Sequence, residues 1–126
     1  AQALLIRLKS DLLPVFAALA DGRLNDANIV FSEDASISVV MAARGYPGMP
    51  VAGGVISGID RAEAVPGARV FQAGTAETDG RLVAAGGRVL TVWATAPAPE
   101  EARERAYQGV AAIRWADALW RRDIGL

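Results

Sequence analysis

An arginine that follows two adjacent glycines is the first feature of this sequence that suggests chemistry. In the stretch DGRLVAAGGRVLTVWA, Gly86 and Gly87 precede Arg88 at the start of an apolar run. Glycines let a ligand approach the backbone, and a guanidinium offers a fork of donors that suits phosphate or carboxylate. The same residues are also typical of a β-turn followed by an edge residue. Taken alone, the stretch leaves both interpretations open.

Two other segments contain candidate binding residues. Lys9 and Ser10 lie in the stretch RLKSD, and Tyr46, Pro47 and Gly48 lie in a loop rich in Gly and Pro. Neither segment matches a known phosphate loop, because GxxxxGK[ST] is absent and no loop has the GxGxxG spacing between a strand and a helix. Both segments also have ordinary structural interpretations, as a solvated helix face and as a turn. They are therefore secondary candidates.

The composition excludes several classes of chemistry within this chain. Its 126 residues include no Cys and no His, which excludes thiol nucleophiles, disulfides, zinc sites and imidazole general bases. The formal net charge of -1 argues against a general partner among nucleic acids or anionic membranes. No apolar run approaches the roughly 20 residues that span a bilayer. We therefore expect a cytoplasmic protein of about one domain, with no nucleic acid and no membrane partner.

The hydrophobic periodicity changes along the chain. Apolar residues at three- and four-residue steps from Leu4 to Leu19 predict an amphipathic core helix that ends near Gly22. Pro14 should bend this helix or begin a new turn. Alternation with period two then predicts strands over residues 36–42, 68–74 and 88–96. Between the last two strands, Asp79-Gly80 predicts a tight hairpin turn.

A second helix is predicted after the stretch APAPEE. Pro99 suits the first helical turn, and the two glutamates that follow it complement the positive end of the helix. Its predicted buried stripe consists of Ala102, Ala106, Val110 and Ile113. The chain is thus expected to have an α+β fold, a mostly antiparallel β domain flanked by an N-terminal and a C-terminal helix.

Six ordered motifs together resemble the C-terminal end of the phosphoribosylamine-glycine ligases. They are RLKSDLLP, VVMAARGYPG, VFQAGT, DGRLVAAGGRVLTV, EARERAYQGVAAI and RRDIG, and they cover nearly the whole chain. That family is similar to the wider ATP-grasp ligases, and it joins glycine to 5-phosphoribosylamine with cleavage of ATP to ADP and phosphate in purine synthesis. The resemblance implies that residues 1–22 form the last helix of an ATP-grasp domain. Residues 23–126 would form a C-terminal β-rich domain of the barrel-sandwich hybrid type.

The resemblance also implies how the chemistry is divided. The family's ATP and Mg ligands lie before the position that matches Ala1, so we expect no catalytic and no metal-binding residue in this chain and no activity from it alone. Its expected partners are glycine, 5-phosphoribosylamine and the missing ATP-grasp and N-terminal domains. A phosphate-binding basic residue of related ligases carries over to Arg88, beside Gly86 and Gly87. Lys9 and Ser10 would face the same cleft, which Tyr46, Pro47 and Gly48 would line or cover.

A non-catalytic β-hybrid binding or carrier-like module is the alternative. Biotinyl and lipoyl carriers need a lysine at a hairpin tip for covalent attachment. Here the expected tip is Asp79-Gly80, and the sole lysine, Lys9, lies in the expected N-terminal helix. These positions count against the carrier interpretation.

Overall fold

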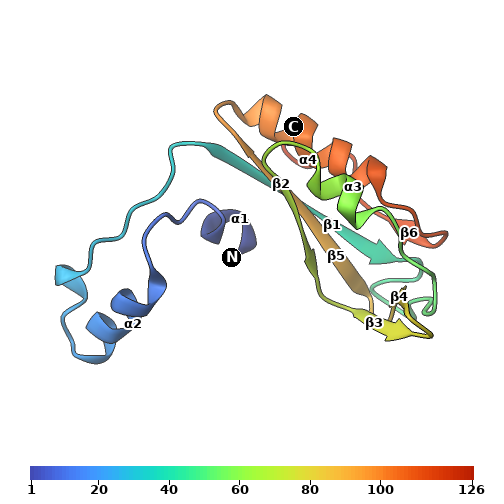
Figure 1. Ribbon diagram of the computed structural model, residues 1–126, viewed down its shortest axis with the longest axis horizontal. Helices are drawn as coiled ribbons and strands as arrows, with labels where there is room; N and C mark the ends of the chain where they lie inside the picture. Colours follow the sequence, from blue (N-terminus) through green and yellow to red (C-terminus); the bar gives the residue numbers. More distant parts are fainter.

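A computed structural model describes residues 1–126 as an N-terminal arm followed by an α+β domain (Figure 1). The arm, residues 1–34, contains helices α1 (Gln2–Leu5) and α2 (Leu12–Ala20) and the 3-10 turn η1 (Leu24–Asp26). The domain contains β1 (Ala35–Ala43), α3 (Ile59–Glu63), β2 (Ala68–Gln72), β3 (Thr75–Thr78), β4 (Arg81–Ala84), β5 (Arg88–Ala96), α4 (Pro99–Ala112) and β6 (Ala118–Leu119).

The strands form antiparallel sheets, which confirms the predicted α+β fold. The main sheet has the order β2-β5-β1-β6, and β3 pairs with β4 in a separate two-stranded sheet. The predicted hairpin is also confirmed, because Asp79 and Gly80 connect β3 to β4 with φ of 51° and 70°. Both values lie in the left-handed region that such a turn requires. The barrel-sandwich hybrid label stays a prediction.

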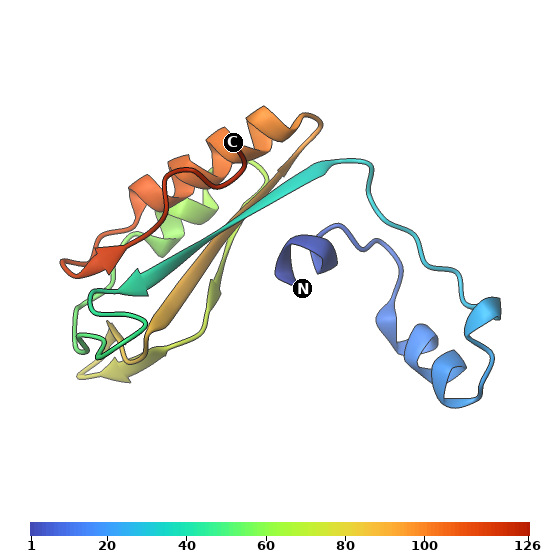
Figure 2. The ribbon, with the colours of Figure 1, turned by 180° about the vertical axis from the view of Figure 1, so that it is seen from behind.

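Helix α4 covers one face of the main sheet and buries the core there (Figures 1 and 2). Alternation along β1 and β5 directs apolar side chains to this face, and Val39, Met41 and Val92 are fully buried. The predicted stripe of small and branched residues is buried: Ala102, Ala106 and Val110 lie on the helix, and Ile113 follows its last residue. The helix begins at Pro99 and has Glu100 and Glu101 in its first turn, as expected. No helix of the chain is long and apolar enough to cross a membrane.

The N-terminal helix predicted from Leu4 to Leu19 is interrupted earlier than expected, because the structure has two short helices with an irregular segment between them, well before Pro14. The backbone N–H of Lys9 donates to the carbonyl of Val30 at 2.8 Å, so this segment bonds to a distant part of the arm. Asp11 then caps α2 by accepting from the N–H of Leu13 at 2.9 Å. Pro14 lies in the first turn of α2, where its missing N–H breaks no helical hydrogen bond.

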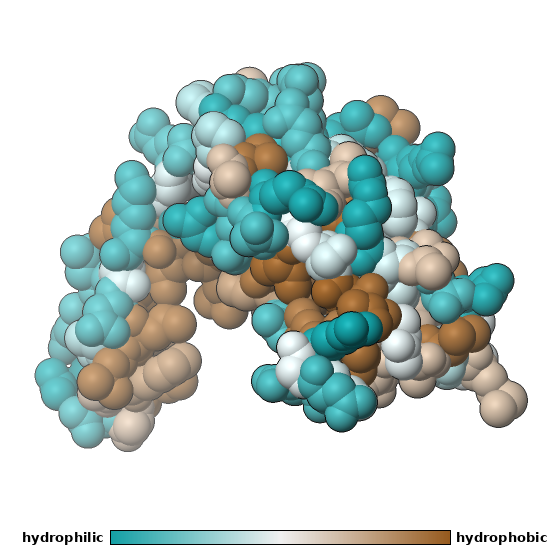
Figure 3. Space-filling model, turned by 45° about the vertical axis from the view of Figure 1, so that its right-hand side comes forward, coloured by the Kyte–Doolittle hydropathy of each residue, from teal (hydrophilic) through white to brown (hydrophobic).

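The apolar stripe of the arm was expected in the core, and this expectation is also wrong. Only Val15 of the stripe is buried, whereas Leu4, Phe16 and Leu19 are more than half exposed. Figure 3 shows apolar side chains exposed along the arm and on the inner side of the arch that it makes with the β domain. The periodicity is therefore that of an amphipathic segment whose apolar face has no partner within residues 1–126.

The C-terminal tail is fastened to α4 by Arg103 and Tyr107. Arg103 donates to the carbonyls of Ile124 at 3.1 Å and Arg122 at 2.9 Å, and its guanidinium lies 4.9 Å from the centre of the Tyr107 ring. The Tyr107 hydroxyl donates to the carbonyl of Arg121 at 2.8 Å and accepts from the N–H of Ile124 at 3.1 Å.

An exposed ion pair adds to this arrangement of the tail. The guanidinium of Arg121 donates to the carboxylate of Asp123, which lowers the pKa of Asp123 to about 2. Arg121 is therefore paired with Asp123 at the surface of this chain at neutral pH.

We predict that Tyr107→Phe loosens the tail without changing the sheet. The substitution removes two hydrogen bonds worth about 0.5–1.5 kcal/mol each, so the free energy of unfolding should fall by roughly 1–3 kcal/mol. Urea titration measures this loss. Amide hydrogen exchange should accelerate at Ile124 and stay slow at Val92 in the core.

Tyr46→Phe is the matched control, because the Tyr46 hydroxyl forms no hydrogen bond within the chain. It should leave both measurements unchanged. Equal losses in the two variants would show that the loss does not come from the tail contacts of Tyr107.

Candidate functional site

A shift in strand register determines the direction of Arg88. Met41 of β1 lies opposite Leu90 of β5, but the next residue, Ala42, lies opposite Arg88, so Val89 is an extra residue in β5. In an unbroken strand Arg88 would share a face with Leu90, which is 1% exposed in the core. The bulge places Arg88 on the other face of the sheet, and bulges beside active sites often redirect a side chain in this way.

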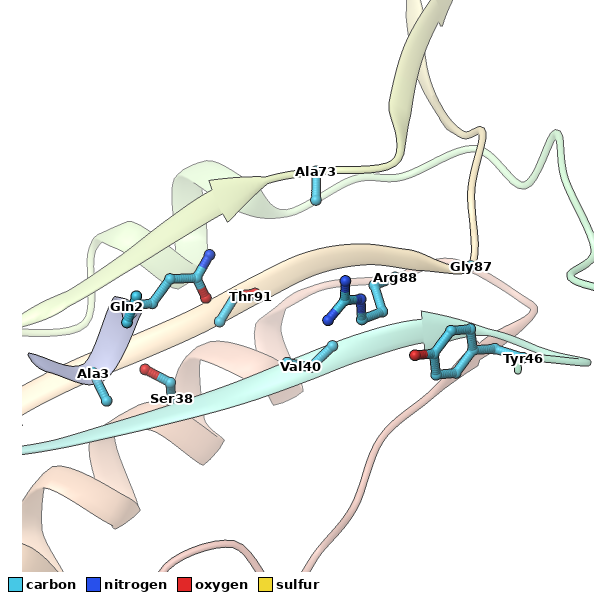
Figure 4. Close-up of a pocket in the computed structure, with 10 residues that line it drawn as sticks. Gln2, Ala3, Ser38, Val40, Tyr46, Ala73, Gly87, Arg88 and Thr91 are labelled. Atoms are coloured by element: carbon cyan, nitrogen blue, oxygen red, sulfur yellow. The ribbon is translucent and has the colours of Figure 1, made fainter. Parts of the chain in front are cut away.

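On that face, Arg88 borders a hollow of about 740 Å³ (Figure 4). Strands β1 and β5 form its floor, the loop after β1 contributes Tyr46, and the start of the arm closes one side. Its lining residues are Ala1, Gln2, Ala3, Ser38, Val40, Tyr46, Ala73, Gly87, Arg88 and Thr91. A hollow of this size is in the range of small-molecule sites.

Arg88 is the only charged side chain in the lining, and it is exposed. Its guanidinium forms no hydrogen bond and no ion pair within the chain, whereas Arg44 on the neighbouring loop pairs with Asp117 at 2.5 Å. No carboxylate lines the hollow. An anion that enters the hollow therefore meets a free cation with all its donors available.

The two glycines before Arg88 each have a packing role. A Cβ on Gly87 would lie 2.5 Å from Cδ2 of Tyr46, so the absence of a side chain lets the aromatic ring lie against the backbone beside Arg88. A Cβ on Gly86 would lie 3.1 Å from the Cα of Gly74. The glycines therefore bring Tyr46 to the edge of the hollow and let two loops approach each other closely.

Other candidates from the sequence lie outside the hollow. Lys9 and Ser10 lie between α1 and α2, not on a helix as predicted, and the structure does not bring them to Arg88. Ser10 borders a different hollow of about 490 Å³ beside α2, where its hydroxyl accepts from the N–H of Val30 at 3.0 Å. Pro47 and Gly48 are exposed in the loop beyond Tyr46 and are not among the lining residues.

Three polar lining residues were missed by sequence reasoning, namely Gln2, Ser38 and Thr91. Ser38 and Thr91 occupy the positions of β1 and β5 that alternate with core residues, so the period-two pattern already placed them on the opposite face. The pattern gave no reason to connect them with Arg88. Arg88 and Thr91 are three residues apart, and in a regular strand this spacing puts the two side chains on opposite faces.

The chain offers no cluster for a metal ion. No group of three or more His, Cys, Asp or Glu side chains lies close enough together to hold one. The residues described here therefore do not fit a magnesium site, and no step of chemistry is assigned to a metal on this chain.

Comparison with known proteins gives one consistent family. Residues 36–126 match the family model of the phosphoribosylglycinamide synthetase C domain. The chain is 49% identical over 124 residues to a phosphoribosylamine-glycine ligase from Mesorhizobium japonicum, covering 98% of this chain and 29% of that protein. A chloroplastic phosphoribosylamine-glycine ligase from Arabidopsis thaliana is 46% identical over 126 residues, which cover 98% of this chain and 24% of the plant protein.

A solved structure supports the same assignment. The crystal structure of phosphoribosylamine-glycine ligase from Thermotoga maritima matches with a TM-score of 0.67 and 33% identity, covering 86% of this chain and 27% of that chain. The chain spans less than a third of the length of these relatives. Its sequence and its structure agree, and the chain therefore belongs to the phosphoribosylglycinamide synthetase C-domain family.

Proposed function

We propose that this chain is the C-terminal portion of a phosphoribosylamine-glycine ligase. The complete enzyme would join glycine to 5-phosphoribosylamine and cleave ATP to ADP and phosphate, as an ATP-grasp ligase of purine synthesis. Family membership supports this proposal, as do relatives of that name that match 98% of the chain. Glycine would be activated as an acyl phosphate and then attacked by the amine of phosphoribosylamine.

The proposed substrate site rests on one observation: the guanidinium of Arg88 is unpaired in a hollow that no carboxylate lines. We assign Arg88 to the phosphate of 5-phosphoribosylamine. The reaction needs no covalent intermediate with the protein, so the contribution of this chain is orientation and charge neutralisation. The bulge in β5 supports this role. Arg88 is the first residue of this core strand, and the bulge places its side chain on the face that carries the hollow.

The remaining machinery belongs, in this proposal, to domains outside the chain. ATP and Mg would be bound by the ATP-grasp domain, with residues 1–22 as its last helical segment and residues 23–126 as the C-terminal domain. The exposed apolar face of the arm supports this division, because Leu4, Phe16 and Leu19 are more than half exposed here and would be buried by a preceding domain. Lys9 and Ser10 would then lie at that boundary.

We predict that Arg88→Ala in the complete enzyme selectively weakens the use of phosphoribosylamine. Loss of a charge-assisted contact worth about 1.5–3 kcal/mol corresponds to a roughly tenfold to hundredfold rise in KM for this substrate. The KM values for ATP and glycine should stay near their starting values in steady-state kinetics. Arg88→Lys should recover part of the loss, because it keeps the charge but loses the fork.

Arg81→Ala is the control for charge alone. Arg81 is exposed on β4, forms no ion pair and borders a separate hollow of about 400 Å³. It should leave all three KM values unchanged. If Arg88→Ala changed all three equally, or changed only the melting temperature, Arg88 would be a structural residue and the assignment would be wrong.

We also predict that residues 1–126 alone release no ADP from ATP in the presence of glycine and phosphoribosylamine. No cluster of acidic side chains on the chain can hold the metal that accompanies ATP. A coupled assay for ADP tests this, with the complete enzyme as the positive control. Turnover by the isolated chain would contradict the proposed division between domains.

A further inference from the structure

Thr91 is a buried polar residue whose hydroxyl has no partner within the chain. Its side chain projects from β5 into the lining of the hollow, on the same face as Arg88 (Figure 4). The residue is 5% exposed and is the only polar residue among the buried ones. Its hydroxyl forms no hydrogen bond with any other group of the chain. Since the side chain lines the hollow, its unpaired hydroxyl is available there to a bound water or ligand.

A second unpaired hydroxyl lies on the floor of the same hollow. Ser38 lines it from β1, and its Oγ atom is buried without a hydrogen-bond partner. The amide of Gln2 faces the same space from α1 (Figure 4). None of these groups is charged, so the surroundings of Arg88 combine one cation with neutral groups that both donate and accept hydrogen bonds.

This combination matches a phosphorylated sugar better than a free phosphate. A phosphate dianion uses the guanidinium fork, and the hydroxyl groups of an attached sugar use neutral donors and acceptors at one side of it. We propose that Thr91, with Ser38 beside it, binds a hydroxyl group of the sugar whose phosphate is held by Arg88. Thr91 is thus a specificity-determining residue, and this assignment rests on the function proposed above.

The experiment measures inhibition of the complete enzyme by two probes, ribose 5-phosphate and inorganic phosphate, each against phosphoribosylamine. Thr91→Val keeps the shape of the side chain and removes the hydroxyl. It should weaken inhibition by ribose 5-phosphate roughly threefold to tenfold and leave inhibition by inorganic phosphate unchanged. Arg88→Ala should weaken inhibition by both probes, because both carry the phosphate.

Two further variants control for packing. Thr91→Ser retains the hydroxyl and should keep most of the affinity for ribose 5-phosphate. Thr95→Val makes the same substitution on the same strand at a residue outside the hollow, and it should change neither inhibition constant. Thermal melts of all variants report on folding, so that a general loss of structure is recognised as such.

The outcomes separate this inference from the proposed function. If Arg88→Ala weakens both probes while Thr91→Val weakens neither, phosphate binding stands and the sugar contact is overturned. If Thr91→Val weakens both probes equally, the hydroxyl contacts the phosphate and the sugar assignment is also overturned. If Arg88→Ala affects neither probe, the proposed phosphate site itself fails.

Discussion

The pairing of β1 with β5 is the constraint on which the rest of the structure depends. These strands form the centre of the main sheet, and their side chains build the core beneath α4 on one face and the floor of the hollow on the other. A single extra residue, Val89, changes the phase of β5 just before Arg88. Without it, a guanidinium would point into the core, where an unpaired charge is strongly unfavourable. The register shift therefore protects the core and supplies the hollow with its cation.

The two faces of the main sheet are covered by other elements to different extents. One face is covered by α3 and α4, and its residues Val39 and Val92 are fully buried. The other face is partly covered by α1, which is fastened there by a hydrogen bond from Ser36 to the carbonyl of Ala3 at 2.6 Å. Val40 on this face remains 40% exposed. A sheet that is closed on one side and open on the other is suited to receive a ligand or another domain on the open side.

Local patterns in the sequence were sufficient for the elements that local interactions determine. Strands β1, β2 and β5, the Asp79-Gly80 turn and the buried stripe of α4 followed from periodicity and turn chemistry, whereas the short strands β3, β4 and β6 were not predicted. The break in the N-terminal helix did not, because it depends on a distant hydrogen bond from Lys9 to Val30. The bulge at Val89 was equally invisible, since an alternating pattern carries no sign of an extra residue. Arg88 was identified from its chemistry alone. That Ser38 and Thr91 line the same hollow could not be predicted without the register of β1 and β5.

Under the proposed function, the position of the charge accounts for a contribution that needs no reactive side chain from this chain. In 5-phosphoribosylamine the phosphate lies away from the amine, so energy gained on the phosphate would serve to hold the amine in place. That task needs rigidity more than reactivity. Arg88 begins a strand whose next residues, Val89 and Leu90, are 0% and 1% exposed, and Gly87 holds the ring of Tyr46 beside it. The chain thus combines a cation and a hydroxyl group on β5 with a second hydroxyl group on β1, and their relative placement follows from the pairing of these two strands.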